Sequence, residues 1–228
     1  IPFIKVWVIL PMALLVMVVF TRLFNRYSQE KLFYIMISSF LAFFALFALV
    51  LYPLNHIIHP NDLTDTLQAY LPAGCRGLLA IFRNWSYVLF YVAAELWGTA
   101  IMSVLFWSFA NEITSVKDAK RFYGILGVGA NIATIFSGHI AILLSGEMFD
   151  LSFVFGDDRW GQSLGLLTTV VIGAGLVTIA IFRWYHVQVL DKDPNLKKMH
   201  TQNNAFRKSV KMGIRKNFSF LKKSKYLL

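Results

Sequence analysis

Residues Trp85 to Ala110 read WSYVLFYVAAELWGTAIMSVLFWSFA, and this stretch decides the fold. A helix needs about 20 consecutive, mainly apolar residues to cross a bilayer, and this run is long enough. Glu95 is the one charged residue within it. A carboxylate near the bilayer centre costs about 3 kcal/mol or more, so such a group usually faces a protein interior or a water-filled cavity. The stretch therefore predicts a membrane helix whose carboxylate has a specific task.

The composition of the whole chain also indicates a membrane protein. Hydrophobic residues make up 57% of the 228 positions and charged residues only 15%, unlike an average soluble domain. The formal net charge of +10 would suit a nucleic-acid partner if the basic residues formed one surface patch. They lie instead in the gaps between apolar runs and in the C-terminal segment, so we expect no nucleic-acid partner.

Five apolar runs have the length of membrane helices. None alternates with period two, as the strands of a membrane barrel do, so we predict an all-α integral membrane fold. The predicted spans are residues 1–20, 32–54, 85–110, 122–144 and 163–184. Together they form a predicted transmembrane bundle over residues 1–186, followed by a basic connecting segment over residues 187–228.

The segment between the second and third spans is more polar and contains Pro60 and Pro72. Its Asp62–Asp65 stretch has the residues of a helix start, so we interpret the segment as a loop with a short interfacial piece. The residues after 187 form either an amphipathic basic helix on anionic lipid or a linker to a second membrane half. We favour the linker.

Lysine and arginine gather on one side of the predicted bundle. Between the spans, those on that side are Arg22, Arg26, Lys31, Lys117, Lys120 and Arg121. Short cytoplasmic loops carry such an excess, so we expect residue 1 outside and the C-terminal tail in the cytoplasm. Five spans put the two ends on opposite sides, and we expect one further helix upstream to complete a six-helix half.

Glu95 belongs to a polar stripe, because Tyr91 lies one turn before it and Thr99 one turn after it on the same helix face. This stripe either lines a hydrated substrate path or holds a buried, protonated carboxyl within the bundle. We favour the path, the usual role of an ionisable group in a membrane.

Lys5 is the second charged residue within a predicted span. The first helix must begin at or before Ile1 to cross about 30 Å, which places Lys5 inside it. Its ammonium either snorkels to the outer headgroups or faces inward, where it would supply a point charge for a phosphate. The residues alone favour snorkelling.

The fourth span is rich in small residues, among them Gly124, Gly127 and Gly129. No strand precedes them and no Lys-Ser or Lys-Thr follows, so neither nucleotide-binding glycine motif is satisfied. We expect them to let helices pack closely. Asn131 is the polar exception; it either bonds a neighbouring helix, which we favour, or touches substrate.

Charged residues at the cytoplasmic ends form a candidate gate of Glu112, Lys120 and Arg121. Their ion pairs would close one state and part in the other, or the residues are simply solvated topology signals.

The histidines are scattered without metal-ligand spacing, so we predict no metal site. No arrangement of catalytic side chains stands out, and we expect neither an enzyme nor a cofactor.

Several motifs carry a resemblance to a known family. They are IPFIK at 1–5, AELWGT at 94–99, LFWSFANEIT at 105–114, AKRFY at 119–123 and GVGAN at 127–131. In these motifs the chain closely resembles the ATP/ADP translocases of plastids and obligate intracellular bacteria, especially chlamydia-like ones. The match runs through all five spans.

The resemblance implies a twelve-helix carrier similar to the major facilitator arrangement, in which this chain covers helices two to six and the cytoplasmic connection. Such a carrier sits in the bacterial inner membrane and exchanges ATP for ADP by alternating access, while relatives carry other nucleotides or NAD. The remaining half of the same carrier would complete the substrate site. Lys5 and Glu95 match the intramembrane charges that matter in the family, and Tyr91, Thr99, Asn131 and Arg22 complete the set of candidate substrate-binding residues.

Two alternatives remain open. One is a nucleotide or NAD carrier that works by uniport or with protons. The other is a membrane scaffold that transports nothing, in which the polar residues within the spans are structural and the basic tail is the working surface.

Overall fold

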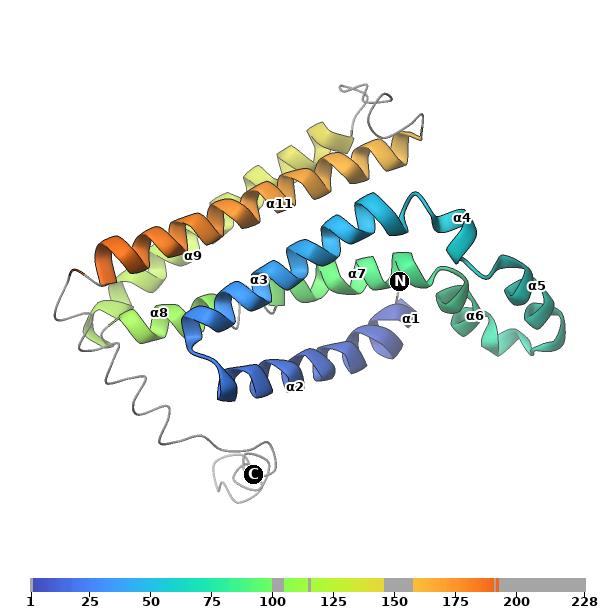
Figure 1. Cartoon of the computed structure of the whole chain (residues 1–228), viewed down its shortest axis with the longest axis horizontal. Coiled ribbons are helices and arrows are strands. Elements are labelled where there is room, and N and C mark those ends of the chain that lie inside the picture. The colour runs from blue at the N-terminus through green and yellow to red at the C-terminus, as the bar shows by residue number, and fades with distance from the viewer. Residues whose placement is uncertain (1, 100–104, 115, 146–157, 191, 193–228) are drawn as a thin grey trace, which may run out of the picture.

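The structure is a computed structural model that describes residues 2–99, 105–114, 116–145, 158–190 and 192. Long helices lie side by side, with a group of short helices at one end (Figure 1). The part of the chain described here contains helices and no strand. The predicted fold class, an all-α membrane protein, is confirmed at this level.

The first long helix runs without a break through α1 (Pro2–Ile4), the π turn η1 (Lys5–Ile9) and α2 (Leu10–Arg26). Pro11 has no N–H to donate, and its ring crowds the carbonyl one turn earlier. The wider π turn directly before it accommodates this defect. The helix continues past the predicted end of the first span, so Arg22 and Arg26 are helical rather than in a gap.

The second long helix consists of α3 (Gln29–Leu46) and the π turn η2 (Phe47–Leu51), which again comes just before a proline, Pro53. Its start is set by Ser28, whose side chain caps the helix by accepting a hydrogen bond from the Lys31 amide at 3.5 Å.

The core lies between α3 and α11 (Arg159–Tyr185). The rings of Phe33 and Phe182 stack with centroids 3.8 Å apart. Further along the same contact, a Cβ at Gly175 would lie 2.6 Å from the side chain of Leu41. Only glycine allows the two helices to approach this closely, which fixes α11 on α3.

Short helices connect the second and third long helices. They are α4 (Asn55–Ile58), α5 (Asn61–Tyr70), η3 (Ala73–Cys75) and α6 (Arg76–Arg83). The predicted helix start near Asp62 is present, but most of the expected loop is helical, with Pro60 and Pro72 between the pieces. The axis then bends by 88° between α6 and α7 (Trp85–Trp97).

Contacts hold this outer segment together and on α7. Arg83 Nη1 of α6 donates to Asp65 Oδ1 of α5 at 2.8 Å, and the Trp85 indole of α7 donates to the Ile58 carbonyl at 3.1 Å. The His59 ring nitrogen lies 2.7 Å from the buried Ser86 hydroxyl.

Four helices of the described part are long and apolar enough to cross a membrane: Lys5–Arg26, Gln29–Leu51, Arg121–Leu144 and Arg159–Val189. A fifth is added if the bent pair α6 and α7 is one span. The expected run over 85–110 is described on both sides of residues 100–104, as α7 and as α8 (Trp107–Ile113). Helix continues through η5 (His186–Leu190), and the predicted basic segment from 193 onward lies outside the described residues.

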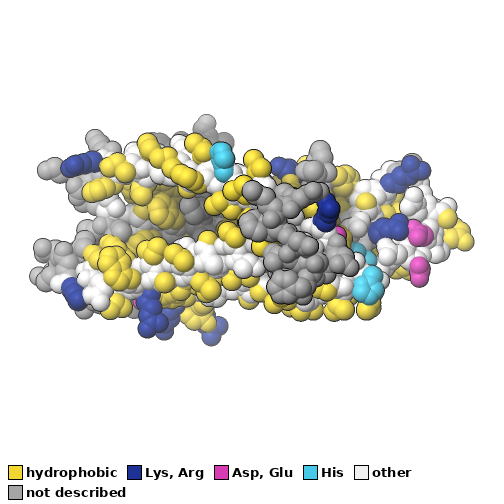
Figure 2. All heavy atoms as spheres, turned by 90° about the horizontal axis from the view of Figure 1, so that it is seen from above, with side chains coloured by type: hydrophobic (Ala, Val, Ile, Leu, Met, Phe, Trp, Pro, Cys, Tyr) yellow, Lys and Arg dark blue, Asp and Glu magenta, His cyan; other side chains and the backbone are white. Residues whose placement is uncertain are grey.

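The helix α9 (Val116–Ser145) packs mainly on α11. None of its described side chains is buried, and a Cβ at Gly124, Gly127, Gly129 or Gly138 would meet no atom within 4 Å. The close packing expected at these small residues is therefore absent from the described part of the chain. In Figure 2, which looks onto α9 and α11, the exposed side chains are mostly hydrophobic and the surface is hollowed between two rows of them.

Candidate functional site

The site begins with the packing of α7 on the first helix. Val88, Val92 and Leu96 lie one turn apart on α7 and are buried in this contact. Their partly buried partners on the first helix include Ile4, Val8, Ile9 and Met12. Tyr91 and Glu95 each come one residue before a buried position, Val92 and Leu96, so this part of the polar stripe lies along the edge of the helix contact.

This register brings Lys5 next to Glu95. The Lys5 ammonium lies 3.8 Å from Glu95 Oε1, and the two side chains are 53% and 47% exposed. The Glu95 side chain is therefore not sealed within the described bundle. Lys5 thus lies beside a carboxylate on the neighbouring helix, the arrangement expected of an ammonium that faces inward.

A pocket of about 460 Å³ opens beside this pair. Its lining residues come from α1, α6, the bend and α7, and are Phe3, Ile4, Gly77, Ala80, Ile81, Asn84, Tyr87, Val88 and Tyr91. Ile4 directly precedes Lys5, and Tyr91 lies one turn before Glu95, so the pocket is next to the ion pair along both helices. A Cβ at Gly77 would lie 3.2 Å from the Phe3 ring, so a glycine is what lets α6 close over α1.

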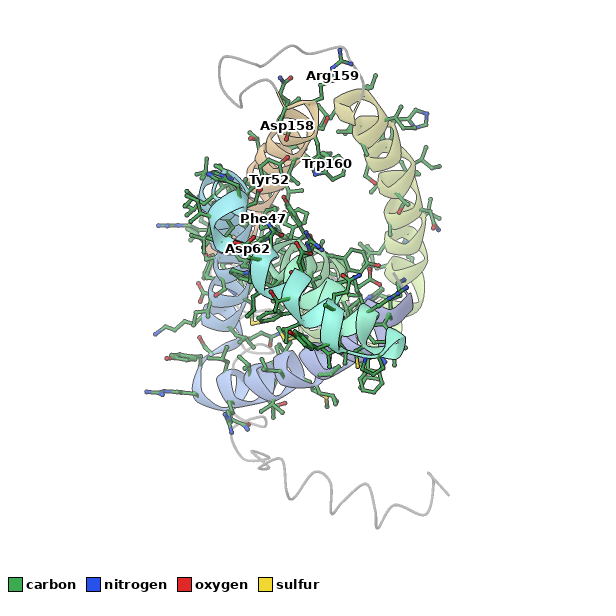
Figure 3. All side chains as sticks on the ribbon, turned by 90° about the vertical axis from the view of Figure 1, so that its right-hand side faces the viewer. Phe47, Tyr52, Asp62, Asp158, Arg159 and Trp160 are labelled. Atoms are coloured by element: carbon green, nitrogen blue, oxygen red, sulfur yellow. The ribbon has the colours of Figure 1, made fainter. Side chains whose placement is uncertain are left out.

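A second polar contact ties α11 to the end of the second long helix. Tyr52 points toward Asp158 at the start of α11 (Figure 3), and its hydroxyl donates to Asp158 Oδ2. Asp158 also caps α11 by accepting from the amides of Trp160 at 3.2 Å and Gly161 at 3.1 Å. The Tyr52 hydrogen bond, helped by these two amides, holds the pKa of the Asp158 carboxyl below its usual value.

The other predicted substrate-binding residues do not join the Lys5–Glu95 pair at one point. Thr99 is exposed at the end of the described part of α7. Arg22 is exposed on α2, 17 residues after Lys5, or about 26 Å along a helix at about 1.5 Å per residue. Asn131 is exposed on α9, which stands apart from α7 in Figure 3.

The candidate gate is described only in part. Glu112 lies in α8 and Lys120 in α9, and both side chains lie outside the described residues. Arg121 is exposed near the start of α9. The same region holds a contact that sequence reasoning did not find, in which the Tyr123 hydroxyl donates to Asn111 Oδ1 at 2.5 Å.

Within the described ranges, no group of three or more His, Cys, Asp or Glu residues could hold a metal ion. His59 instead packs edge-to-face on Tyr87 with ring centroids 4.9 Å apart, and burial lowers the pKa of its imidazole. His186 lies in the aromatic cluster around Phe182, where the two ring centroids are 4.5 Å apart. These two histidines therefore contribute to packing.

A family model described as "TLC ATP/ADP transporter" matches residues 1–228. The chain belongs to the TLC ATP/ADP transporter family. The resemblance seen in the motifs is thus confirmed, and with it the assignment to a family of transporters rather than enzymes.

Similar proteins include carriers from bacteria and plastids. "ADP,ATP carrier protein 1" of Chlamydia muridarum is 43% identical over 228 residues, which is 100% of this chain and 42% of that protein. The protein of the same name from Chlamydia pneumoniae is 42% identical over all of this chain and 44% of its own length. "ADP,ATP carrier protein 2, chloroplastic" of Arabidopsis thaliana is 41% identical over 227 residues and 35% of its length. This TLC family chain thus spans less than half the length of these relatives, and no solved structure matches it.

Sequence reasoning found Glu95, Lys5 and Tyr91 but missed Phe3, Asn84 and the pocket. The residues that line the pocket form no motif in the sequence, and only the bend that folds α6 over α1 brings them together. An aromatic residue close before Lys5 and another one turn before Glu95 were the available signals.

Proposed function

We propose that the full-length protein exchanges ATP for ADP across a membrane by alternating access. The single observation that carries this proposal is the half-exposed Lys5–Glu95 ion pair on adjacent helices of a TLC family chain. An intramembrane pair of this kind is typical of a substrate path, and its exposure leaves both charges accessible to an anion. The names of the relatives from Chlamydia and Arabidopsis supply the nucleotide.

In the proposed mechanism, Glu95 neutralises Lys5 while the carrier is empty. A nucleotide phosphate then competes for the ammonium, which is a compact point charge suited to phosphate oxygens. The released Glu95 carboxylate accepts hydrogen bonds from ribose hydroxyls or base amines. Lys5 and Glu95 would thus alternate between two partners, and strict exchange follows if the empty carrier crosses between states only slowly.

The remaining parts of the site are proposals of the same kind. Tyr91 and Thr99 line the path beside Glu95, Arg22 provides a cation further along it, and Asn131 contributes from α9. Glu112, Lys120 and Arg121 form the cytoplasmic gate. The chain supplies five helices of a six-helix half, similar to the major facilitator arrangement, and a basic cytoplasmic connection over 187–228 leads to the second half, which rocks against the first.

We place residue 1 outside and the tail in the cytoplasm of a bacterial inner membrane, from the distribution of lysine and arginine.

The test is uptake of radiolabelled ATP into vesicles that contain the full-length protein and a varied internal ADP concentration. Exchange predicts that uptake rises with internal ADP and saturates, and that unlabelled ADP outside competes. Uptake that ignores internal ADP would point to a uniporter or a proton-coupled carrier. A lack of uptake of ATP, GTP and NAD by folded protein would favour the scaffold.

A further inference from the structure

We infer that the pocket beside the ion pair holds the purine base of the nucleotide, and that Asn84 favours adenine over guanine in it. This inference rests on the proposed function, because it places one end of the nucleotide relative to Lys5. The pocket is formed by α1, α6, the bend and α7, and its volume of about 460 Å³ is within the usual range for a small-molecule site.

The shape of a nucleotide fits the order of groups along these two helices. Phosphates are charged, whereas the base is flat and largely apolar, so the two ends need different surroundings. Lys5 provides the charge, and the neighbouring Ile4 already belongs to the pocket wall. On α7, Glu95 and Tyr91 are one turn apart, about 6 Å along the axis, with Tyr91 on the pocket side. A nucleotide with phosphate at Lys5 therefore has its base at the pocket.

The walls carry the groups that bind bases. Phe3, Tyr87 and Tyr91 are three aromatic side chains around one opening, with Ile81 and Val88 as the apolar floor. Stacking of a base on an aromatic ring contributes about 1–3 kcal/mol and suits any base. The Tyr91 side chain is half-buried, and its hydroxyl has no hydrogen-bond partner within the described part of the chain, so a polar group of the ligand can reach it.

Asn84 gives the pocket a preference among bases. Its amide nitrogen donates to the Ala80 carbonyl at 3.1 Å, and because a carbonyl can only accept, Oδ1 must face elsewhere. Asn84 lines the pocket, and within the described residues its Oδ1 has no hydrogen-bond donor. Adenine carries an amino donor at the position where guanine carries a carbonyl acceptor. Asn84 therefore accepts a hydrogen bond from adenine and meets a second acceptor in guanine.

The decisive experiment separates the base from the phosphates. In vesicles with the full-length protein, the Michaelis constant for ATP is compared with inhibition by inorganic tripolyphosphate, which has no base. Ala80→Trp fills the pocket mouth and should raise the constant for ATP about 5-fold or more, with unchanged tripolyphosphate inhibition. Leu78→Trp adds the same bulk to α6 at a residue that is 53% exposed and outside the pocket lining, and should change neither.

If Ala80→Trp weakens the binding of ATP and of tripolyphosphate equally, or changes neither, the pocket does not hold the base. Asn84→Leu should raise the constant for ATP roughly 3-fold to 10-fold, and it should lower the constant for GTP or leave it unchanged, because the clash between two acceptors is removed. A parallel rise for both nucleotides would remove the assigned role of Asn84.

Photolabelling tests the site without any substitution. We expect 8-azido-ATP to label the peptide around residues 77–91, with protection by ATP and none by tripolyphosphate. Labelling confined to other peptides would overturn the inference even if exchange itself is intact. Failure of the proposed function looks different, because the unaltered protein would then show no dependence of ATP uptake on internal ADP.

Discussion

The Lys5 ammonium lies 3.8 Å from the Glu95 carboxylate, across the contact between the first helix and α7. Both side chains are about half exposed, and half-exposed ion pairs contribute at most about 1 kcal/mol to stability. The pair is thus easily separated by a competing anion. This property suits a group that must exchange partners in each transport cycle.

Replacement of Lys5 should affect transport far more than folding. A charged group that binds phosphate contributes about 1.5 to 3 kcal/mol, so Lys5→Ala should lower ATP exchange roughly 10-fold to 150-fold. The thermal unfolding midpoint should stay close to that of the unaltered protein. Lys31→Ala removes an exposed cation at the start of α3 and serves as the control. Equal exchange by the two variants would exclude Lys5 from the phosphate site.

Glu95→Gln tests the carrier against the scaffold. The amide keeps the shape of the side chain but no longer neutralises Lys5, so the empty carrier should hold phosphate too tightly or fail to cross between states. Exchange should fall about 10-fold or more. A scaffold would keep its behaviour as long as the bundle folds, so unchanged exchange with a normal unfolding midpoint would contradict our assignment.

Gly175→Ala should destabilise the contact between α3 and α11. The added methyl group would lie 2.6 Å from Leu41, and overpacking of this kind costs about 1–3 kcal/mol. Gly173→Ala is a matched control on the same helix, because nothing lies within 4 Å of its Cβ position. Thermal unfolding in detergent should show a lower midpoint for the first variant and an equal or higher one for the second. Equal midpoints would mean that the helices separate freely at this point.

Tyr52→Phe should loosen the start of α11. It removes the hydroxyl that donates to Asp158, which costs about 0.5–1.5 kcal/mol. Because the pKa of Asp158 is lower in the folded protein, its contribution to stability is complete above the unfolded pKa and is lost as the pH falls through the folded one. Stability measured between pH 6 and pH 3 should thus decline less steeply in Tyr52→Phe. An unchanged slope would show that Asp158 is held by its amide contacts alone.

The outer segment should weaken in mild acid through His59. Burial lowers the pKa of this histidine, so its imidazole is protonated at a lower pH in the folded protein than in the unfolded chain. Stability should therefore fall as the pH drops below about 6.5. His59→Gln should reduce this fall in hydrogen exchange of α5 and α6, and His56→Gln, at an exposed position, should not. If His56→Gln removes the acid effect instead, the effect does not come from His59.

The sequence allowed the fold class and the charged residues to be predicted, because a long apolar run in lipid must satisfy its own backbone as a helix. Glu95 stands out in such a run because a carboxylate within the bilayer has a high free-energy cost. Its pairing with Lys5 depends on the register of two helices far apart in the chain, and no local pattern encodes that register. The pocket was missed for the same reason, since Phe3 and Asn84 meet only after α6 folds back over α1.

The helix axis turns by nearly a right angle between α6 and α7. Only Asn84 lies between the two helices, so the first residue of α6 is the part of that helix farthest from the bend. Cys75, the one cysteine of this sequence, directly precedes that far end. A dye attached to Cys75 would therefore lie at the end of α6 that is remote from the bend, outside the pocket lining.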